Sequence, residues 1–208
     1  MYLEILDPKR KKFLSKLGFL KKYGFYMAGG TALALQIGHR TSLDFDFYTE
    51  KKFDARKLRE QFDKKIKRVQ EIYITEDTLG LDVNGIKMSF FRYSYRLIRP
   101  CVQIEDICLA SKEDIAGMKI LAISQRGKRR DFIDIYFLIK EFGLRKIMKF
   151  TKEKYSMFNI YVGLQGLVYF KDADEDSGKQ RFKTLQKADW RGIKKYIVKE
   201  VNIIKGSL

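Results

Sequence analysis

The chain has 208 residues, of which 45% are hydrophobic and 14% aromatic, a composition that excludes a disordered chain and allows either one domain or two small lobes. The formal net charge of +17 favours a polyanionic partner, above all nucleic acid, although a lysine-rich solvated surface would give the same count. The basic residues are spread over several segments, among them PKRKK and RGKRR, which favours a broad surface that follows phosphates over a single localisation tag.

Membrane insertion and secretion are not expected. No apolar run approaches the roughly 18 residues of a membrane span, and the first 20 residues mix charged and apolar side chains, unlike a signal peptide. Cys101 and Cys108 lie seven residues apart, without a Cys or His partner at the spacing of a zinc site. We therefore expect free thiols in a reducing compartment, and hence a cytoplasmic protein.

The first predicted elements are a helix and a strand. Residues 4–23 have the apolar spacing of an amphipathic helix. Its core-facing stripe contains three leucines, Leu14, Leu17 and Leu20. The apolar segment FYMA at 25–28 is expected to form a short strand, followed by a Gly29-Gly30 turn.

The next predicted elements are a short helix and an alternating strand. Residues 31–38 are expected to be helical, with Thr31 as the cap and Gly38 as the stop. The segment SLDFDFY alternates strictly, so its apolar side chains share one face while Asp44 and Asp46 share the other.

The rest of the chain divides into a strand-rich part and a helical part. A basic helix is expected at 54–65, followed by the strands VQEIYIT, TLGLDV and IKMSFFRYSY, with turn signals at Thr78 and Asn84-Gly85. After Pro100 the patterns are helical. We expect an α+β fold, with an α/β lobe over residues 1–105 and a helical lobe over 106–208 that completes the cleft for nucleotide and acceptor.

The two aspartates are the strongest chemical signal. Residues two apart on a strand point the same way, with roughly 6–7 Å between their Cα atoms, and Mg²⁺ prefers such oxygen ligands together with substrate phosphates. An isolated D-x-D motif is more often the acidic face of a half-exposed strand. Here, however, it follows the Gly29-Gly30 turn, where the backbone can approach a phosphate closely and a helix N-terminus attracts anions. Asp44 and Asp46 are therefore predicted to hold a metal beside a phosphate-binding turn.

These motifs resemble a known family. The sequence GGT at 29–31 followed by DFD at 44–46 resembles the nucleotidyltransferase superfamily with the polymerase-beta-like fold. The wider sequence of residues 25–200 is similar to the AbiEii/AbiGii-type toxin family. The similarity rests on the segments AGGTALALQIGHRTSLDFDFY, IKMSFFRYSY, LASKEDIAGMKILAISQRGKRRDFIDIYFLI and GLVYFKDADE. It implies a polymerase-beta-like nucleotidyltransferase sheet with flanking helices.

The resemblance also implies an activity. Members transfer NMP from an NTP, often to tRNA, in type IV toxin–antitoxin or phage-defence systems, so Mg²⁺, an NTP, an RNA acceptor and a cognate antitoxin are the expected partners. Asp44 and Asp46 would hold one or two metal ions in an in-line displacement. Gly29, Gly30 and Thr31 would hold the β- and γ-phosphates.

The metal site departs from the full superfamily pattern. Members with a complete triad carry a third carboxylate on a later strand, and the matching position here is Ser89. Asp82 on the preceding strand is either the replacement ligand or a hairpin-end residue. The base that would activate the acceptor remains unassigned.

The helical part supplies further candidate residues. Lys119 lies on an apolar helical stripe, where it either extends to the edge or serves as a cation for the triphosphate. The segment RGKRRDFIDIYFL matches the family's Arg-to-Asp motif, with Arg126 and Asp131 at its ends. Asp131 is expected either to orient Lys119 or to cap its helix, and Asp134 to need a basic partner. Arg126 and Arg40 are the expected nucleotide-binding arginines.

Several other residues have competing interpretations. His39, the only histidine, is expected to make an end-of-helix contact rather than bind a metal. Tyr48 lines the base pocket or packs at its rim. Ser111 and Asp114 fit a capping box, and residues 128–130 contact nucleic acid or form a solvated turn.

Three functions are compatible with these patterns. The first is a Mg²⁺-dependent nucleotidyltransferase that acts on RNA as a toxin. The second is a non-catalytic nucleotide- or RNA-binding module with a degenerate site, as Ser89 suggests. The third is nucleotidyl transfer to a protein hydroxyl, which explains the positive charge less well.

Overall fold

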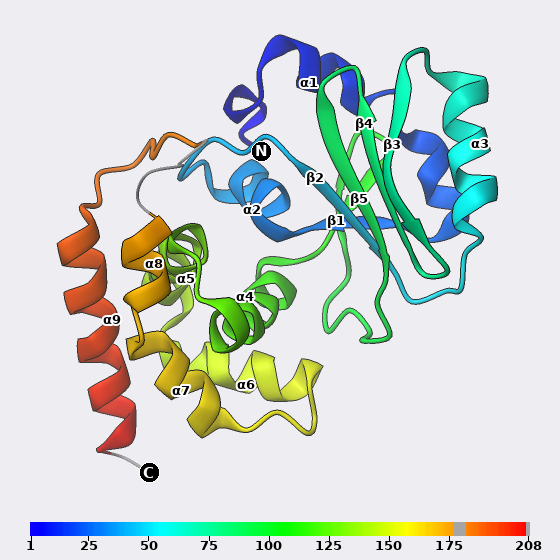
Figure 1. Cartoon of the computed structure of the whole chain (residues 1–208). Helices are drawn as coiled ribbons and strands as arrows, with labels where there is room; N and C mark the ends of the chain where they lie inside the picture. The colour runs from blue at the N-terminus through cyan, green and yellow to red at the C-terminus, as the bar shows by residue number, and fades with distance from the viewer. Residues whose placement is uncertain (177–181, 207–208) are drawn as a thin grey trace.

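The computed structural model describes residues 1–176 and 182–206 (Figure 1). Its centre is a seven-stranded mixed sheet in the order β3-β4-β5-β2-β1-β7-β6. The strands are β1 (Tyr26–Ala28), β2 (Phe45–Thr49), β3 (Val69–Thr75), β4 (Thr78–Val83), β5 (Ile86–Arg92), β6 (Val102–Ile104) and β7 (Ile107–Leu109). Strand β2 pairs antiparallel with β1 and parallel with β5, while β1 pairs parallel with β7.

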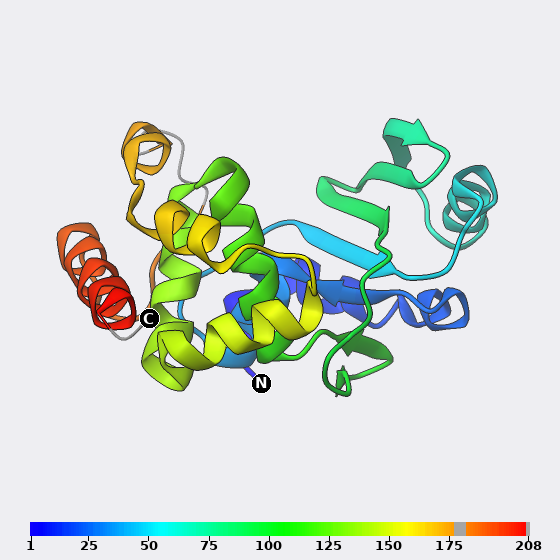
Figure 2. The same ribbon diagram turned by 90° about the horizontal axis from the view of Figure 1, so that it is seen from below.

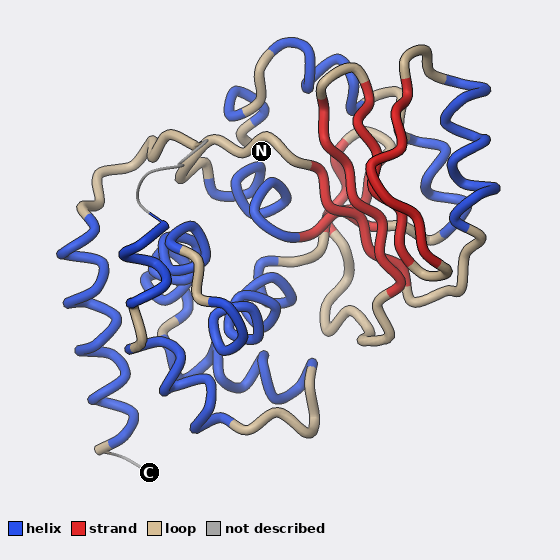
Figure 3. Tube along the Cα trace, in the orientation of Figure 1, coloured by secondary structure: helices blue, strands red, loops and turns tan. Residues whose placement is uncertain are grey.

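The helices form two groups around the sheet. The α-helices are α1 (Pro8–Leu14), α2 (Gly29–Ile37), α3 (Ala55–Lys65), α4 (Lys112–Arg126), α5 (Arg129–Phe142), α6 (Leu144–Lys154), α7 (Ile160–Val168), α8 (Lys171–Glu175) and α9 (Trp190–Lys205). Helices α4 to α9 gather beside the sheet, with α2 packed between them and strands β1 and β2 (Figure 3). Figure 2 shows the helical group and the sheet standing side by side. Among the described residues, none of the helices combines the length and hydrophobicity that a bilayer span requires.

The N-terminal segment is not the single helix expected over residues 4–23. It forms the 3-10 helix η1 (Leu3–Ile5), then α1, then the 3-10 helix η2 (Gly18–Tyr23). The break occurs because Asp7 caps a new helix, with its carboxylate accepting the Arg10 N–H at 2.8 Å and a proline following at the first helical position. The three leucines of the predicted stripe are nevertheless buried, as expected.

The two faces of the sheet differ in chemistry. Phe47 of β2 and Phe90 of β5 are buried on one face, with ring centroids 5.4 Å apart, and Phe62 of α3 packs edge-on against Phe90. Because side chains alternate along a strand, Asp46 and Ser89 point to the opposite face. Helix α3 therefore covers the apolar face and leaves the acidic face free for the site.

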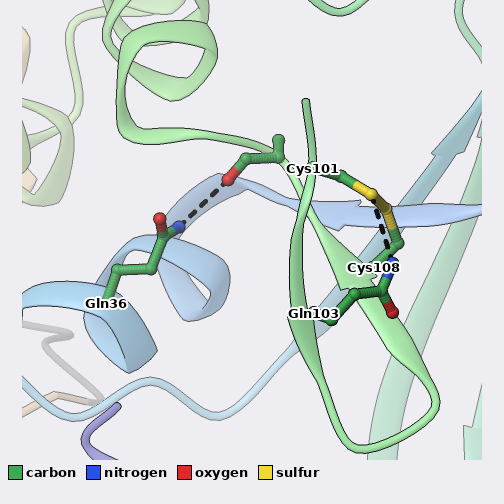
Figure 4. The surroundings of a disulfide bond; sticks show 5 residues. Gln36, Cys101, Gln103 and Cys108 are labelled. Carbon is green, nitrogen blue, oxygen red and sulfur yellow. Dashed lines mark hydrogen bonds between the residues drawn. A yellow bond between two sulfur atoms is a disulfide. The ribbon is translucent and has the colours of Figure 1, made fainter. Parts of the chain in front are cut away.

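The β6–β7 hairpin was not expected, because the sequence after Pro100 is helix-patterned. The hairpin turns at Glu105, whose φ is +50°, and adds two strands to the sheet edge beside β1. The prediction of free thiols is wrong, because the hairpin brings Cys101 close to Cys108, with 5.6 Å between their Cα atoms, and they form a disulfide (Figure 4). The thiols consequently lend no support to a cytoplasmic location.

Helix α4 is fixed at its start by Asp114. The predicted cap is confirmed, because Ser111 Oγ accepts the Asp114 N–H at 3.0 Å. The Asp114 carboxylate also accepts the N–H of Ile98 at 2.9 Å and pairs with Lys154 Nζ of α6 at 2.8 Å. This carboxylate thus joins α4, α6 and the segment that leaves β5. Sheet and helices share one buried core, and the lobe division at residue 105 stays a prediction.

Replacing Asp114 tests this junction. Both side chains of the Asp114–Lys154 pair are 0% exposed, so Asp114→Asn leaves a buried ammonium without its counter-charge. We expect the free energy of unfolding to fall by about 3–5 kcal/mol in urea denaturation. The matched control is Glu153→Gln, which removes the exposed partner of Arg99 and costs less than about 1 kcal/mol. Equal effects of the two substitutions would contradict this role of Asp114.

Candidate functional site

The glycine turn and Asp46 lie side by side. Strand β1 ends at Ala28, whose partner on the neighbouring strand β2 is Asp46. Helix α2 begins directly afterwards, at Gly29. Gly29 has φ +72°, which L side chains rarely adopt, and a Cβ there would lie 3.3 Å from Asp46 Oδ2. The glycine therefore gives the backbone its turn and lets a carboxylate approach it. The first N–H groups of α2, which have no partner within the helix, start beside this carboxylate.

Thr31 does not cap α2, contrary to the sequence prediction. The helix starts two residues earlier, since the Gly29 conformation allows it, and its N-cap residue is Ala28, without a side-chain cap. Thr31 is buried, and its hydroxyl contacts Ser42 Oγ at 2.7 Å and donates to the Asp44 carbonyl. Its side chain therefore fixes the backbone of Asp44, and the predicted contact with phosphates stays a prediction. Gly38 ends the helix in a left-handed conformation, as expected.

Asp46 lies in an electrostatically demanding position. Asp44 directly precedes β2, and Asp46 within the strand pairs with Ser89 of β5. Burial raises the pKa of Asp46 and the charge of Asp44 raises it further, whereas Arg130, Lys119 and the hydrogen bond from Ser89 act in the opposite direction. Ser89 thus stands beside Asp46, where a third carboxylate was expected.

The donor set fits a magnesium ion that binds together with substrate phosphates. Two carboxylates and a nearby hydroxyl are hard oxygen ligands, and Mg²⁺ commonly takes one or two carboxylates in addition to phosphate oxygens. The alternative third ligand, Asp82, accepts the Gly85 N–H at 2.6 Å and so belongs to the β4–β5 turn. Within residues 1–176 and 182–206, no group of three or more His, Cys, Asp or Glu side chains is arranged to hold a metal.

A buried ionic cluster, consisting of His39, Arg40, Lys119, Asp131 and Asp134, joins α4 and α5 to the loop after α2. Lys119 Nζ lies 2.7 Å from Asp131 Oδ1 and 2.5 Å from Asp134 Oδ2. Arg40 donates to both Asp134 oxygens, from Nε at 2.7 Å and from Nη2 at 2.9 Å. His39 Nε2 lies 2.7 Å from Asp134 Oδ1. The expectation that the two aspartates need basic partners is confirmed.

Electrostatics hold the cluster in one protonation state. Burial alone would raise the pKa of Asp134, but the charges of Arg40 and Lys119 hold it well below its usual value. Burial alone would lower the pKa of Lys119, yet Asp131 and Asp134 outweigh burial and raise it. Burial lowers the pKa of His39, against the opposing effect of Asp134. With a neutral histidine, two cations balance two anions.

Arg40 connects the cluster to the glycine turn. A Cβ on Gly30 would collide with the Arg40 guanidinium, so only glycine allows this approach. The guanidinium is buried, with Nε and Nη2 on Asp134 and Nη1 on the Thr41 carbonyl at 3.0 Å. Its predicted contact with nucleotide stays a prediction. The same holds for Lys119 and Asp131, although Asp131 Oδ2 is buried without a hydrogen-bond partner in the described part of the chain.

Arg126 is the exposed last residue of α4. Burial and the charge of Asp46 raise the pKa of Tyr48 on β2, and the charge of Arg126 acts in the opposite direction. Tyr48 stacks on Tyr26 at a centroid distance of 6.1 Å and packs edge-on against Tyr93 at 5.4 Å. The packed-rim interpretation of Tyr48 therefore has structural support, and the nucleotide-binding role of Arg126 stays a prediction.

A basic pocket opens beside Asp44. It has a volume of about 240 Å³ and is lined by Arg10, Arg40, Ser42, Leu43, Asp44, Gly85, Lys87, Lys128, Arg130, Asp176 and Phe182. Arg10 and Lys87 were not singled out from the sequence, because only the packing of α1 and the β4–β5 turn brings them to Asp44. The basic segment PKRKK, which contains Arg10, was the only signal for it in the sequence, and no pattern pointed to Lys87.

The lowered pKa of His39 predicts a pH dependence of stability. Between the ordinary pKa of 6.5 and the lowered one, the unfolded chain binds a proton that the folded chain does not, so acidification destabilises the fold. The substitution His39→Gln removes the group that titrates, and with it this loss of stability on acidification, but keeps an N–H donor for Asp134. We expect the stability of the wild type relative to the variant to fall by about 1 kcal/mol or more between pH 8 and pH 5.5 in urea denaturation.

Because His39 is the only histidine, no other side chain of this type titrates in that window. A stability difference that grows on acidification would contradict a neutral, buried His39 and would place a third positive charge in the cluster.

Comparison with known proteins shows the family and the fold. The family model described as nucleotidyl transferase AbiEii toxin, type IV TA system, matches residues 14–203. An uncharacterized protein of Aquifex aeolicus (strain VF5), aq_aa25, is 44% identical over 158 residues, which is 73% of this chain and 76% of the relative.

Solved structures share the fold. JHP933 from Helicobacter pylori superposes with a TM-score of 0.63 at 18% identity, covering 98% of this chain and 94% of that chain. MenT4, the nucleotidyltransferase toxin Rv2826c of Mycobacterium tuberculosis H37Rv, gives a TM-score of 0.59 at 12% identity, covering 92% of this chain and 80% of that chain. The predicted α+β nucleotidyltransferase fold is thus confirmed. On the match over nearly its whole length, the chain belongs to the AbiEii family of type IV toxin–antitoxin systems and is a nucleotidyltransferase.

Proposed function

We propose that this nucleotidyltransferase uses Mg²⁺ to transfer NMP from an NTP to an RNA acceptor, with tRNA as the foremost candidate, and that a cognate antitoxin opposes it in the cytoplasm. The observation that carries the proposal is the contact between the Gly29 turn and the Asp46 carboxylate, with Asp44 two residues away. This arrangement provides backbone N–H donors for phosphates directly beside carboxylates for a metal.

The chemistry is an in-line displacement at the α-phosphorus. A hydroxyl oxygen of the acceptor forms a bond to phosphorus, the bond to the pyrophosphate oxygen breaks, and the hydroxyl proton leaves to solvent or to a base that remains unassigned. Mg²⁺ held by Asp44 and Asp46 would neutralise the developing charge on the phosphate oxygens. The N–H groups that open α2 orient the β- and γ-phosphates.

The buried ionic cluster positions these groups. Arg40 lies against Gly30 and is fixed by Asp134, so the turn that receives the phosphates is held from behind. Lys119 and Arg130 contribute positive potential at Asp46, as their effect on its pKa indicates. A positive field at the site favours a triphosphate and the charge that develops during transfer.

The positive charge of the protein favours RNA as the acceptor. The chain carries a formal net charge of +17, and basic side chains line the pocket beside Asp44. A protein hydroxyl would not require this field. The non-catalytic alternative rests on one observation: Ser89 stands beside Asp46, where complete metal triads carry an acid.

Transfer can be measured directly. The wild type is incubated with Mg²⁺, total tRNA and each α-labelled NTP in turn, and the products are separated into RNA and protein. We expect label in tRNA with one preferred nucleotide. The variant Asp44→Asn/Asp46→Asn loses the carboxylate charges at nearly constant shape and should lower the rate at least about 100-fold.

The matched control is Asp63→Asn, which neutralises an exposed carboxylate on α3, away from the acidic face. It should transfer label like the wild type. Label in protein would show that the acceptor is a protein and not RNA. If NTP binds but no label is transferred, the non-catalytic module is favoured.

Ser89→Asp tests whether the acidic pair is built for a cation. A third carboxylate beside Asp46 adds repulsion, so without Mg²⁺ we expect a loss of about 1 kcal/mol, a decrease in Tm of about 2–4 °C. Mg²⁺ should restore the Tm of this variant and have less effect on Ser89→Asn, which has the same size and no charge. Equal responses of both variants to Mg²⁺ in thermal unfolding would refute a metal at this position.

A further inference from the structure

The basic pocket adjoins the candidate site and shares Arg40 and Asp44 with it. Its other cations come from three elements: Arg10 of α1, Lys87 of β5, and Lys128 and Arg130 at the start of α5. It lies at the start of β2, beside Asp44. The acidic pair is therefore bordered by basic side chains where β2 begins.

Arg10 is held in a defined position. Its Nε donates to the Leu43 carbonyl at 2.8 Å, and its guanidinium pairs with Asp7, the residue that caps α1. The Arg10 side chain is only 14% exposed. This contact fixes a positive charge at the residue that directly precedes Asp44, so the pocket wall is built rather than formed by mobile side chains alone.

Lys87 and Lys128 complete the pocket from opposite sides. Lys87 is two residues before Ser89 on β5 and thus shares the acidic face of the sheet. Lys128 is the exposed residue that precedes α5. Within residues 1–176 and 182–206, neither ammonium group makes an ion pair or a hydrogen bond, so both charges are available to a ligand.

The positive surface continues beyond the pocket. A neighbouring groove is lined by Lys9, Lys12 and Phe13 of α1, by Lys16 just after this helix, and by Asn84 and Ile86 at the β4–β5 turn. Both depressions share α1 and this turn, so cations follow one another from Asp44 along α1. One triphosphate cannot occupy both the glycine turn and this strip. A chain of phosphates, spaced along a polymer, can.

We propose that the basic pocket binds backbone phosphates of the RNA acceptor close to its reacting end, so that the acceptor reaches the site from the Asp44 side and continues along α1. This inference rests on the proposed function. It assigns Lys87, Lys128 and Arg10 to the acceptor, while the glycine turn serves the NTP. Phosphate contacts of this kind position a nucleic acid without selecting its sequence.

The test uses Lys87→Gln/Lys128→Gln, because these exposed residues can change without disturbing the fold. Binding of total tRNA is measured without NTP over a series of salt concentrations, and the KM values for NTP and tRNA are determined separately. Each lost phosphate contact should reduce the slope of log K against log salt by about 0.7–0.9, and binding at 0.1 M salt should weaken at least about fivefold. The KM for NTP should not change.

The matched control is Lys57→Gln/Lys64→Gln on α3, which removes the same charge from the helix that covers the opposite face of the sheet. It should keep the wild-type slope and affinity. Thermal unfolding of both double variants confirms that each is folded.

The outcomes separate the two proposals. A pocket variant with the wild-type affinity and slope for tRNA overturns this inference, as does one that loses NTP affinity alone, because the cations then serve the triphosphate. A wild type that puts no label on tRNA refutes the RNA acceptor. If its tRNA binding still depends on Lys87 and Lys128, the phosphate pocket stands without the transfer reaction.

Discussion

The ion pairs of the buried Asp134 carboxylate hold the candidate site together. The Asp134 carboxylate accepts two hydrogen bonds from Arg40 and also contacts Lys119 and His39. An isolated charge in this position would be strongly unfavourable, whereas two cations opposite two anions make burial tolerable. The balance requires a neutral His39, and burial lowers its pKa in that direction. The arrangement fixes α4 and α5 of the helical group to the loop that leads into β2.

The cluster constrains the glycine turn because Arg40 belongs to the cluster and packs against Gly30. Its guanidinium lies against Gly30, so a side chain there would displace it from Asp134. Thr31 holds the Asp44 carbonyl from the same turn, and Gly29 leaves room for the Asp46 carboxylate. The turn and the acidic pair are therefore positioned by neighbouring residues of one short segment, while the helical group holds that segment from behind.

The candidate site places two acidic side chains, Asp44 and Asp46, in a strongly basic protein. Asp46 is half-buried, and burial together with Asp44 raises its pKa, so the pair is at its least stable without a cation. The charges of Arg130 and Lys119 lower this cost. A positive field around paired carboxylates is the environment that the proposed binding of phosphate and Mg²⁺ requires.

The sequence by itself determined the fold family, the acidic pair and its neighbouring turn, because these depend on residues close in the chain and on a strand period of two. It also indicated that Asp131 and Asp134 need basic partners, since buried acids on an apolar helix must be paired. Only the tertiary structure decided which partners they have, that Thr31 holds Asp44, that Cys101 meets Cys108, and that Arg10 and Lys87 border the site. These contacts join residues distant in the chain or related by an unpredicted hairpin, and local patterns carry no information about which distant segments pack together.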